Sequence, residues 1–335
     1  MAAPSGPLRA GLIGLGSMGR NHARVLSSLA GVELVAVADP AGDPSGAAHG
    51  VPVLTSFDAL LDRGLDYCVV AAPTALHLET GLQLAAAGVH ALIEKPVATN
   101  TDTAQQLVAA FEKADLVGAV GHIERYNPAL QQLRTRLESG ELGEIYQIAT
   151  RRQGPFPGRI SDVGVVMDLA SHDLDLTAFI SGSEFAAISA RTAHKSGREH
   201  EDLVAATGQL QDGTITNHLV NWLSPMKERV TVVTGDKGTF IADTLTADLT
   251  FHANGTVALD WQDIAHFRGI TEGDMIRYAF AKPEPLRTEH EAFRDAVLGK
   301  DSGIVTLAQG MAAVRVAEAA LESAATGGAV RLADR

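Results

Sequence analysis

The 335-residue sequence predicts an α/β domain with a parallel, doubly wound sheet, followed by an α+β domain with a large, mostly antiparallel open sheet. Up to about residue 121, apolar strands alternate with amphipathic helices, as in a parallel sheet covered on both faces. Beyond about residue 143, β-rich runs follow one another, separated by turns such as Gln211-Asp212-Gly213. We therefore expect domains at 1–121 and 122–335, with the C-terminal helices packing back toward the first domain.

The segment 8–39 is a strand, a glycine turn, a helix and a second strand. Gly14, Gly16 and Gly19 have the spacing G-x-G-x-x-G. The first glycine permits a tight turn, the second lets the backbone approach a pyrophosphate, and the third lets helix and strand pack closely. The helix is expected to begin near Ser17 and Met18, so its free N–H groups and positive dipole end would face the phosphates. This order predicts a Rossmann domain that binds a dinucleotide.

The form of the dinucleotide is indicated by Asp39, which ends the second strand 20 residues after Gly19. A carboxylate at a spacing of about 20 can accept hydrogen bonds from the adenosine ribose. It would also repel a 2′-phosphate, and residues 40–43 contain no Arg or Lys to bind one. NAD is therefore favoured over NADP.

Ligands of such sheets bind at the carboxyl ends of the strands, so the residues that follow each strand are candidate site residues. Lys95 comes two residues after the end of the strand 89–93 and directly precedes a proline. The residues alone leave two interpretations open for it: a lysine that points at a bound cofactor, or an exposed loop lysine. The cofactor-contact candidates at these strand ends are Ala72, Pro73, Thr74, His77, Glu94 and Lys95.

In the second half, a helix from about Met167 to Ile180 carries Asp168 and His172 at positions i and i+4, which share one face. Taken alone, such a pair is more often a solvent-facing ion pair than a catalytic one. The charged segment 196–202 is expected to be a solvated loop. An open sheet leaves one face to be covered, which predicts a homodimer or homotetramer formed through that face.

Composition narrows the classes of partner and the compartment. The net charge of −13 argues against nucleic acid or an anionic membrane as the main partner, because both need a basic face. No apolar run of about 18 residues is present, and the start MAAPSGP lacks the pattern of a secretory signal, so a cytoplasmic protein is expected. Cys68, the one cysteine, lies in an apolar run and is expected to be a buried structural thiol. The histidine spacings predict no metal site.

Three motifs in order resemble the glucose-fructose oxidoreductase / inositol dehydrogenase (Gfo/Idh/MocA) family over nearly the whole chain. They are the turn GLGSMG, Glu94-Lys95-Pro96, and Asp168-x-x-x-His172 at the head of a helix before an open sheet. Within the family, residues 121–130 and 151–175 look like the branch of UDP-N-acetylglucosamine 3-dehydrogenases and related nucleotide-sugar 3-dehydrogenases. The wider family often has a run of glycines before the acid, and this chain departs from that pattern at residues 162–167.

The resemblance implies oxidation of a secondary sugar hydroxyl to a ketone, most specifically C3 of UDP-N-acetylglucosamine, with Lys95, Asp168 and His172 as the catalytic group. An imidazole is a suitable general base near neutral pH, and an ammonium stabilises a developing alkoxide. The acid would fix the histidine tautomer or orient the sugar. Two alternatives remain open: a dehydrogenase of another sugar, inositol or glycoside, and a non-catalytic NAD-binding sensor or scaffold.

A nucleotide-sugar substrate needs hydrogen-bond donors for its diphosphate, and arginine is well suited to bind phosphate oxygens in pairs. Arg125, Arg152 and Arg159 lie in segments near the catalytic motifs. Arg151 and Arg152 are successive residues of one strand, so they cannot both point into one pocket. We favour Arg152 and Arg159; the alternative is that these arginines pair with surface acids.

Overall fold

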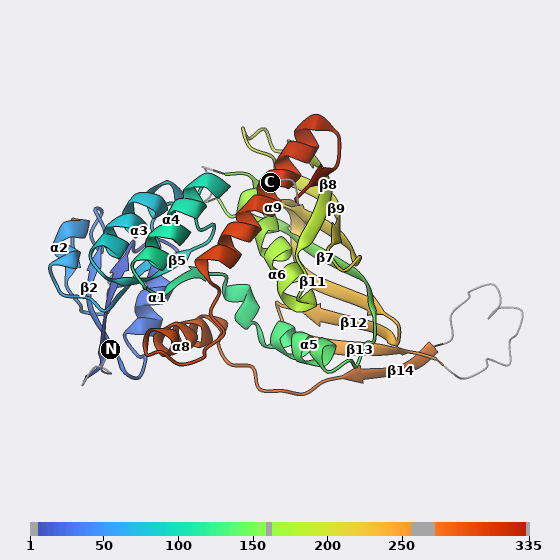
Figure 1. Cartoon of the computed structure of the whole chain (residues 1–335), viewed down its shortest axis with the longest axis horizontal. Coiled ribbons are helices and arrows are strands. Elements are labelled where there is room, and N and C mark those ends of the chain that lie inside the picture. Colours follow the sequence, from blue (N-terminus) through green and yellow to red (C-terminus); the bar gives the residue numbers. More distant parts are fainter. Residues whose placement is uncertain (1–5, 159–162, 256–271, 333–335) are drawn as a thin grey trace, which may run out of the picture. The chain divides into compact units, whose positions relative to one another are not determined.

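The computed structural model describes residues 6–158, 163–255 and 272–332 (Figure 1). The chain divides into two compact units. The first consists of Met1–Tyr126 and Pro283–Arg315, and the second of Asn127–Lys282 and Val316–Arg335.

The first unit contains a six-stranded sheet in the order β3-β2-β1-β4-β5-β6, and every pair of neighbouring strands is parallel. Its strands are β1 (Leu8–Ile13), β2 (Val32–Ala38), β3 (Val53–Leu54), β4 (Tyr67–Val70), β5 (His90–Glu94) and β6 (Gly118–Gly121). The predicted doubly wound parallel sheet is confirmed. The strand order reverses between β1 and β4, and such a switch point is where these sheets bind ligands.

Helices pack on this sheet and form the core of the first unit together with it. They are α1 (Gly19–Leu26), α2 (Phe57–Leu61), η1 (Thr74–Leu76), α3 (His77–Ala86), α4 (Thr101–Lys113), η2 (Ile123–Tyr126) and α8 (Pro285–Val297). Although α8 lies near the end of the chain, its Phe293 packs edge-on against Tyr67 of β4, with ring centroids 5.3 Å apart. Cys68 is fully buried beside Tyr67, as predicted, and burial raises the pKa of its thiol.

The second unit contains a nine-stranded sheet in the order β14-β13-β12-β11-β7-β10-β9-β8-β15. Its strands are β7 (Ile145–Pro155), β8 (Phe185–Ala193), β9 (Leu203–Leu210), β10 (Ile215–Asn221), β11 (Leu223–Gly235), β12 (Gly238–Asp243), β13 (Asp248–Asn254), β14 (Glu272–Arg277) and β15 (Val330–Arg331). β7 and β10 are parallel, and all other neighbours are antiparallel. The predicted large, mostly antiparallel sheet is therefore confirmed.

One face of the second sheet is covered by helices α5 (Pro128–Glu138) and α6 (Ser171–Ser181), which pack on β12, β13 and β7 (Figure 1). β10 shows how its residues alternate between the two faces. Thr216, His218 and Val220 are buried, whereas Ile215 and Leu219 have 46% and 36% of their surface exposed. The sheet is thus open on the side opposite these helices, as its sequence predicts.

Several elements differ from the sequence-based expectation. Residues 289–298 have the sequence pattern of a helix, but α8 begins earlier, at Pro285, because a proline is well tolerated in the first turn of a helix. β11 extends back to Leu223 through a register shift between Leu223 and Glu228, which absorbs an irregular stretch. α9 (Leu307–Thr326) contributes residues to both units. Residues 256–260, for which the sequence pattern predicts a strand, lie outside the described residues. None of the described helices is long and apolar enough to cross a membrane.

Candidate active site

The three glycines of the turn between β1 and α1 have different surroundings and therefore different roles. Gly14 has φ of 90°, and a Cβ on it would lie 2.6 Å from the carbonyl oxygen of Ala71. A Cβ on Gly19 would lie 1.9 Å from the carbonyl oxygen of Gly14, whereas a Cβ on Gly16 would meet no atom within 4 Å. The first and third glycines are therefore required by the packing of the protein itself, and the space beside Gly16 is open to a ligand.

Asp39 joins the end of β2 to the same turn. Its Oδ2 accepts a hydrogen bond from the Leu15 N–H at 2.7 Å, and its Oδ1 accepts one from the Ala41 N–H at 2.8 Å. A carboxylate has about four acceptor positions, so ribose hydroxyls can still bind to it. At the start of α1 the N–H groups of Arg20 and Asn21 donate to the carbonyls of Gly16 and Met18, and the helix dipole makes this end positive. Open space at Gly16, a helix N-terminus and a carboxylate together fit NAD.

The backbone of Lys95 is held on both sides. Glu94, the last residue of β5, is buried, and its Oε2 accepts a hydrogen bond from the Lys95 N–H at 3.1 Å. The Lys95–Pro96 peptide bond is cis, and the Pro96 carbonyl oxygen lies 3.0 Å from Nδ1 of His77. Lys95 itself is half-buried. This placement contradicts the exposed-loop interpretation of Lys95, and its catalytic role stays a prediction.

His77 links two of the predicted cofactor-contact loops. Its Nε2 lies 2.9 Å from the carbonyl oxygen of Ala72 and its Nδ1 faces Pro96, so both ring nitrogens meet backbone carbonyls. Burial lowers the pKa of His77, although the carbonyl contacts act in the opposite direction. The imidazole thereby joins the segment Ala72-Pro73-Thr74 to the segment after β5. Direct contact between these residues and the cofactor stays a prediction.

Asp168 and His172 lie at the start of the long helix of the second unit. Asp168 is in a π-helical turn, η3 (Val166–Ala170), where the Ser171 N–H bonds to the Val166 carbonyl five residues back. His172 is in the first turn of α6, and both side chains are buried. Burial excludes the solvent-facing ion pair that is the common interpretation of this spacing. The π turn, a feature often found at functional sites, is not evident from the sequence pattern.

Glu201 holds the beginning of this π turn. Its Oε1 accepts a hydrogen bond from the Val166 N–H at 3.0 Å, and its backbone oxygen accepts one from the Val165 N–H at 2.9 Å. A Cβ on Gly164 would lie 2.0 Å from Oε1 of Glu201, so only glycine allows this close approach. Glu201 therefore supports the turn that carries Asp168.

The expectation of a solvated loop at 196–202 is wrong at its last two residues, Glu201 and Asp202, which are both buried. Asp202 accepts hydrogen bonds from the N–H groups of Lys195 and Ser196 and from the Ser196 hydroxyl. Burial raises the pKa of Asp202, but these hydrogen bonds outweigh it and hold the pKa below its ordinary value. Charged residues are buried here because backbone donors satisfy them.

Arg151 and Arg152 point to opposite faces of β7, as the alternation of a strand predicts. Arg151 is exposed and pairs with Glu228 at 2.5 Å. Arg152 is buried, and its Nε lies 2.6 Å from Oδ1 of Asp173, the residue after His172. The alternative of a surface ion pair therefore holds for Arg151 but not for Arg152. Arg152 ties β7 to the first turn of α6, and its contact with a diphosphate stays a prediction.

The remaining predicted substrate residues are Arg125 and Arg159. Arg125 lies in η2 of the first unit, is buried, and donates a hydrogen bond to Oε1 of Gln309 at 3.1 Å. Arg159 lies outside the described residues. Within the described part of the chain, no three His, Cys, Asp or Glu side chains are grouped so as to hold a metal ion.

The sequence-based reasoning missed His22, His290 and Glu289, three buried polar residues of the first unit. For His22 a signal existed, because it lies on the buried face of α1 together with Gly19 and Ala23. A histidine at an apolar-face position of the helix that follows a glycine turn requires a polar partner in the core.

The fold and these residues define an NAD-binding oxidoreductase. Residues 8–122 match the model of an oxidoreductase family with an NAD-binding Rossmann fold, and residues 130–241 match the GFO/IDH/MocA C-terminal domain. The chain belongs to the Gfo/Idh/MocA oxidoreductase family. Its relatives include NAD-dependent dehydrogenases that act on CH–OH groups. The residues that match the NAD-binding model lie in the first unit.

Curated relatives include enzymes with different substrates. UDP-N-acetylglucosamine 3-dehydrogenase of Acidithiobacillus ferrooxidans is 36% identical over 213 residues, which are 63% of this chain and 66% of that enzyme. The scyllo-inositol 2-dehydrogenase (NAD(+)) of Bacillus subtilis is 27% identical over 54% of this chain and 56% of that enzyme. The matched part of this chain thus spans between about half and two thirds of the length of these relatives.

Solved structures match over nearly the whole chain. The Acidithiobacillus ferrooxidans UDP-N-acetylglucosamine 3-dehydrogenase has a TM-score of 0.82 at 27% identity, covering 94% of this chain and 97% of that chain. The WlbA dehydrogenase of Bordetella pertussis, in complex with NADH and UDP-GlcNAcA, has a TM-score of 0.82 at 23% identity, with 98% of both chains covered. The second match shows a shared fold.

Proposed function

We propose that this protein oxidises the C3 hydroxyl of UDP-N-acetylglucosamine to a ketone, giving UDP-3-keto-N-acetylglucosamine and NADH. The observation that carries the proposal is the burial of Asp168 and His172 at the π turn that opens α6. An acid and a histidine held away from bulk solvent on one helix are suited to proton abstraction. The named relative with 36% identity supports the choice of substrate.

The chemistry requires that a hydride leave C3 and that the hydroxyl proton be removed. In the proposal His172 takes the proton, because an imidazole ordinarily titrates near pH 6.5 and is a good base at neutral pH. Asp168 fixes the tautomer of that imidazole or orients the sugar, and the Lys95 ammonium stabilises the developing alkoxide. NAD, when bound, supplies the acceptor for the hydride.

The first experiment measures the absorbance of reduced nicotinamide when the protein and NAD meet UDP-N-acetylglucosamine. Free N-acetylglucosamine, glucose and myo-inositol are measured in parallel. The products are also examined by mass spectrometry for a sugar that has lost two hydrogens, because a cofactor that is recycled while bound would give no net absorbance. We expect the UDP-sugar to be oxidised and the three compounds without UDP to remain unchanged. Binding of NAD and UDP-sugar without any oxidised product would instead support a non-catalytic sensor.

The proposed roles of Lys95 and His172 are tested by separate alanine variants. Each of Lys95→Ala and His172→Ala should lower turnover by at least about 10²-fold, the lower end of the effect of a positioned acid or base. Lys113→Ala removes an exposed lysine at the end of α4, in the same unit as Lys95, and is the matched control. Turnover close to that of Lys113→Ala in either variant would remove that residue from the mechanism.

A second candidate, a dehydrogenase of a free sugar or inositol, is favoured by one observation. Arg152, which we expected to bind the diphosphate, is engaged by Asp173 in a buried ion pair. A substrate without phosphate would not need this arginine, and an NAD-dependent inositol dehydrogenase is among the relatives. Oxidation of free sugars or myo-inositol at rates equal to that of the UDP-sugar would select this candidate.

The open face of the second sheet supports a further part of the proposal, a homodimer or homotetramer. Ile215 and Leu219 on β10 are large apolar residues exposed on this face of the sheet. Large exposed apolar side chains that gather on one face mark contact surfaces. We expect a mass above that of the monomer in light scattering, and Leu219→Glu should lower it. A monomer mass that does not change with concentration would contradict this assembly.

A further inference from the structure

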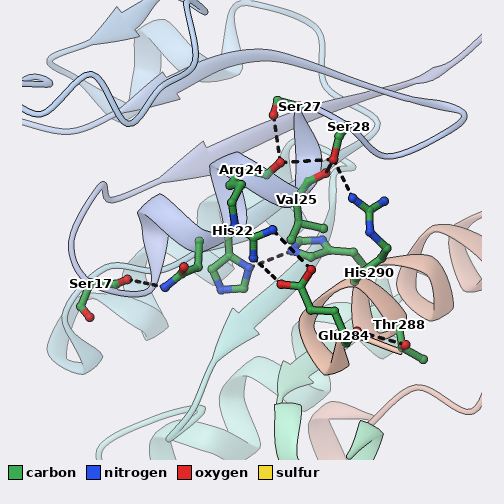
Figure 2. Close-up of polar contacts among 11 residues, drawn as sticks. Ser17, His22, Arg24, Val25, Ser27, Ser28, Glu284, Thr288 and His290 are labelled. Carbon is green, nitrogen blue, oxygen red and sulfur yellow. Dashed lines mark hydrogen bonds and ion pairs between the residues drawn. The ribbon is translucent and has the colours of Figure 1, made fainter. Parts of the chain in front are cut away.

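A chain of buried polar groups connects α8, α1 and the end of β5 within the first unit. His22 on α1 faces His290 on α8, with its Nδ1 2.8 Å from Nε2 of His290 and the two rings edge-on (Figure 2). The other ring nitrogen of His22, Nε2, lies 2.9 Å from Oε1 of Glu94. All three side chains are buried. On the protein surface beside them, Arg24 and Glu284 form an ion pair between the same two helices (Figure 2).

The donor and acceptor roles in this chain follow from the charge of Glu94. Burial raises the pKa of Glu94, but the hydrogen bond and charge of His22, together with Lys95, outweigh burial and hold the pKa below its ordinary value. An ionised carboxylate only accepts hydrogen bonds, so Nε2 of His22 must carry a proton. The same is true of the neutral and the cationic form of His22, because in both forms Nε2 must donate to the carboxylate. The structure therefore fixes the tautomer of His22.

The surroundings of Glu94 disfavour a second negative charge in this part of the core. Glu289, next to His290, is also buried, and its carboxyl oxygens have no hydrogen-bond partner among the described residues. Burial, and then the charge of Glu94, raise the pKa of Glu289 well above its ordinary value, which favours its neutral form. Burial likewise lowers the pKa of His290 far enough to keep it uncharged. Glu94 is thus the carboxylate that His22 binds.

Glu94 contacts both His22 and the backbone of Lys95. One oxygen of its carboxylate binds His22, and the other accepts the Lys95 backbone N–H. Gly121 lies opposite Glu94 on β6, and a Cβ there would be 3.0 Å from Oε1 of Glu94, so a larger residue would crowd the carboxylate. The two hydrogen bonds and the close approach of Gly121 hold the Glu94 carboxylate between His22 and the peptide group of Lys95.

We propose that His22, supported by His290, is a positioning residue that holds the Glu94 carboxylate and, through it, the backbone of Lys95. This inference rests on the function proposed above, in which Lys95 acts on the substrate hydroxyl. Neither histidine contacts substrate in this proposal. α1 also begins at the glycine turn, so the same helix that receives the cofactor pyrophosphate would set the position of Lys95.

The kinetic test compares His22→Leu, which removes the donor to Glu94, with His22→Gln, whose amide nitrogen can replace Nε2. We expect His22→Leu to lower kcat between about 10- and 100-fold, because a shift of about 1 Å at a reacting group has effects of this size. The affinity for NADH should change by less than about threefold, so that kcat and cofactor binding separate. His22→Gln should recover most of kcat. His290→Leu should have a smaller effect in the same direction as His22→Leu.

The matched control is His218→Gln in the second unit, a buried histidine bonded to Thr150 and Thr216 rather than to a carboxylate. It should lose thermal stability and keep its kcat. An unchanged kcat in His22→Leu would overturn the proposal. Equal losses in His22→Leu and His22→Gln would overturn it as well, because the donor would then be irrelevant.

A second measurement does not depend on turnover. In the ¹⁵N spectrum of the full-length protein labelled at histidine, the signals of His22, assigned by their loss in His22→Gln, should show a proton on Nε2 at pH 7. Glu94→Gln should shift that signal. Protonation of His22 on Nδ1 alone would overturn the proposed network. If the wild-type protein oxidises no sugar, the proposed function fails, and this spectrum still decides whether His22 holds Glu94.

Discussion

Alanine substitutions at the glycines of the β1–α1 turn should separate cofactor binding from folding. Gly16→Ala places a methyl group where no protein atom lies within 4 Å, so the protein can accommodate it. The same methyl would occupy the space through which a pyrophosphate approaches the backbone. We expect Gly16→Ala to weaken NADH binding at least about tenfold, which corresponds to about 1.4 kcal/mol.

Gly19→Ala should have the opposite profile, because its methyl group would lie 1.9 Å from the Gly14 carbonyl oxygen, far inside the 3.4 Å at which ordinary contact begins. Overpacking of this kind costs about 1–3 kcal/mol, which lowers the melting temperature of a domain of this size by about 2–12 °C. Both variants are measured by NADH fluorescence titration and by thermal unfolding without ligand. Destabilisation by Gly16→Ala equal to that by Gly19→Ala would refute the assignment of open space at Gly16.

Three further outcomes follow from the contacts described above. Arg152→Leu should lower the free energy of unfolding in urea by about 3–5 kcal/mol, because it leaves the buried Asp173 carboxylate without this ion-pair partner. Arg151→Leu breaks an exposed pair and should lower it by less than about 1 kcal/mol. Equal losses in the two variants would contradict the buried pair. Asp39→Asn removes the charge that repels a 2′-phosphate and should raise NADP affinity relative to NAD, so an unchanged ratio would contradict its role. Asp202 has a lowered folded pKa, so it stabilises the protein above about pH 4 and loses this contribution as the pH falls through that pKa. The stability difference between wild type and Asp202→Asn should therefore narrow in acid, and a constant difference would contradict this.

Local features of the sequence were sufficient for much of the fold. β5 lies one residue from the strand expected at 89–93, and α4 ends one residue before the helix that the pattern of residues 101–114 predicts, because hydrophobic periodicity and helix caps act over a few neighbours. The opposite orientations of Arg151 and Arg152 also follow from the two-residue period of a strand. Their partners, Glu228 and Asp173, could not be predicted, because the strand period does not specify what lies on either face.

The sequence by itself determined the two sheets, the glycine turn with Asp39, and the residue types of the catalytic motifs, since each depends on spacings of at most about twenty residues. The tertiary structure alone decided which polar residues share the core. His22 and His290 are 268 residues apart and meet because α8 returns to pack against α1. It also decided that Glu201 supports the π turn of Asp168. Such contacts depend on how separate elements pack in three dimensions, and hydrophobic patterning specifies that an element has a buried face but not which side chain will meet it there.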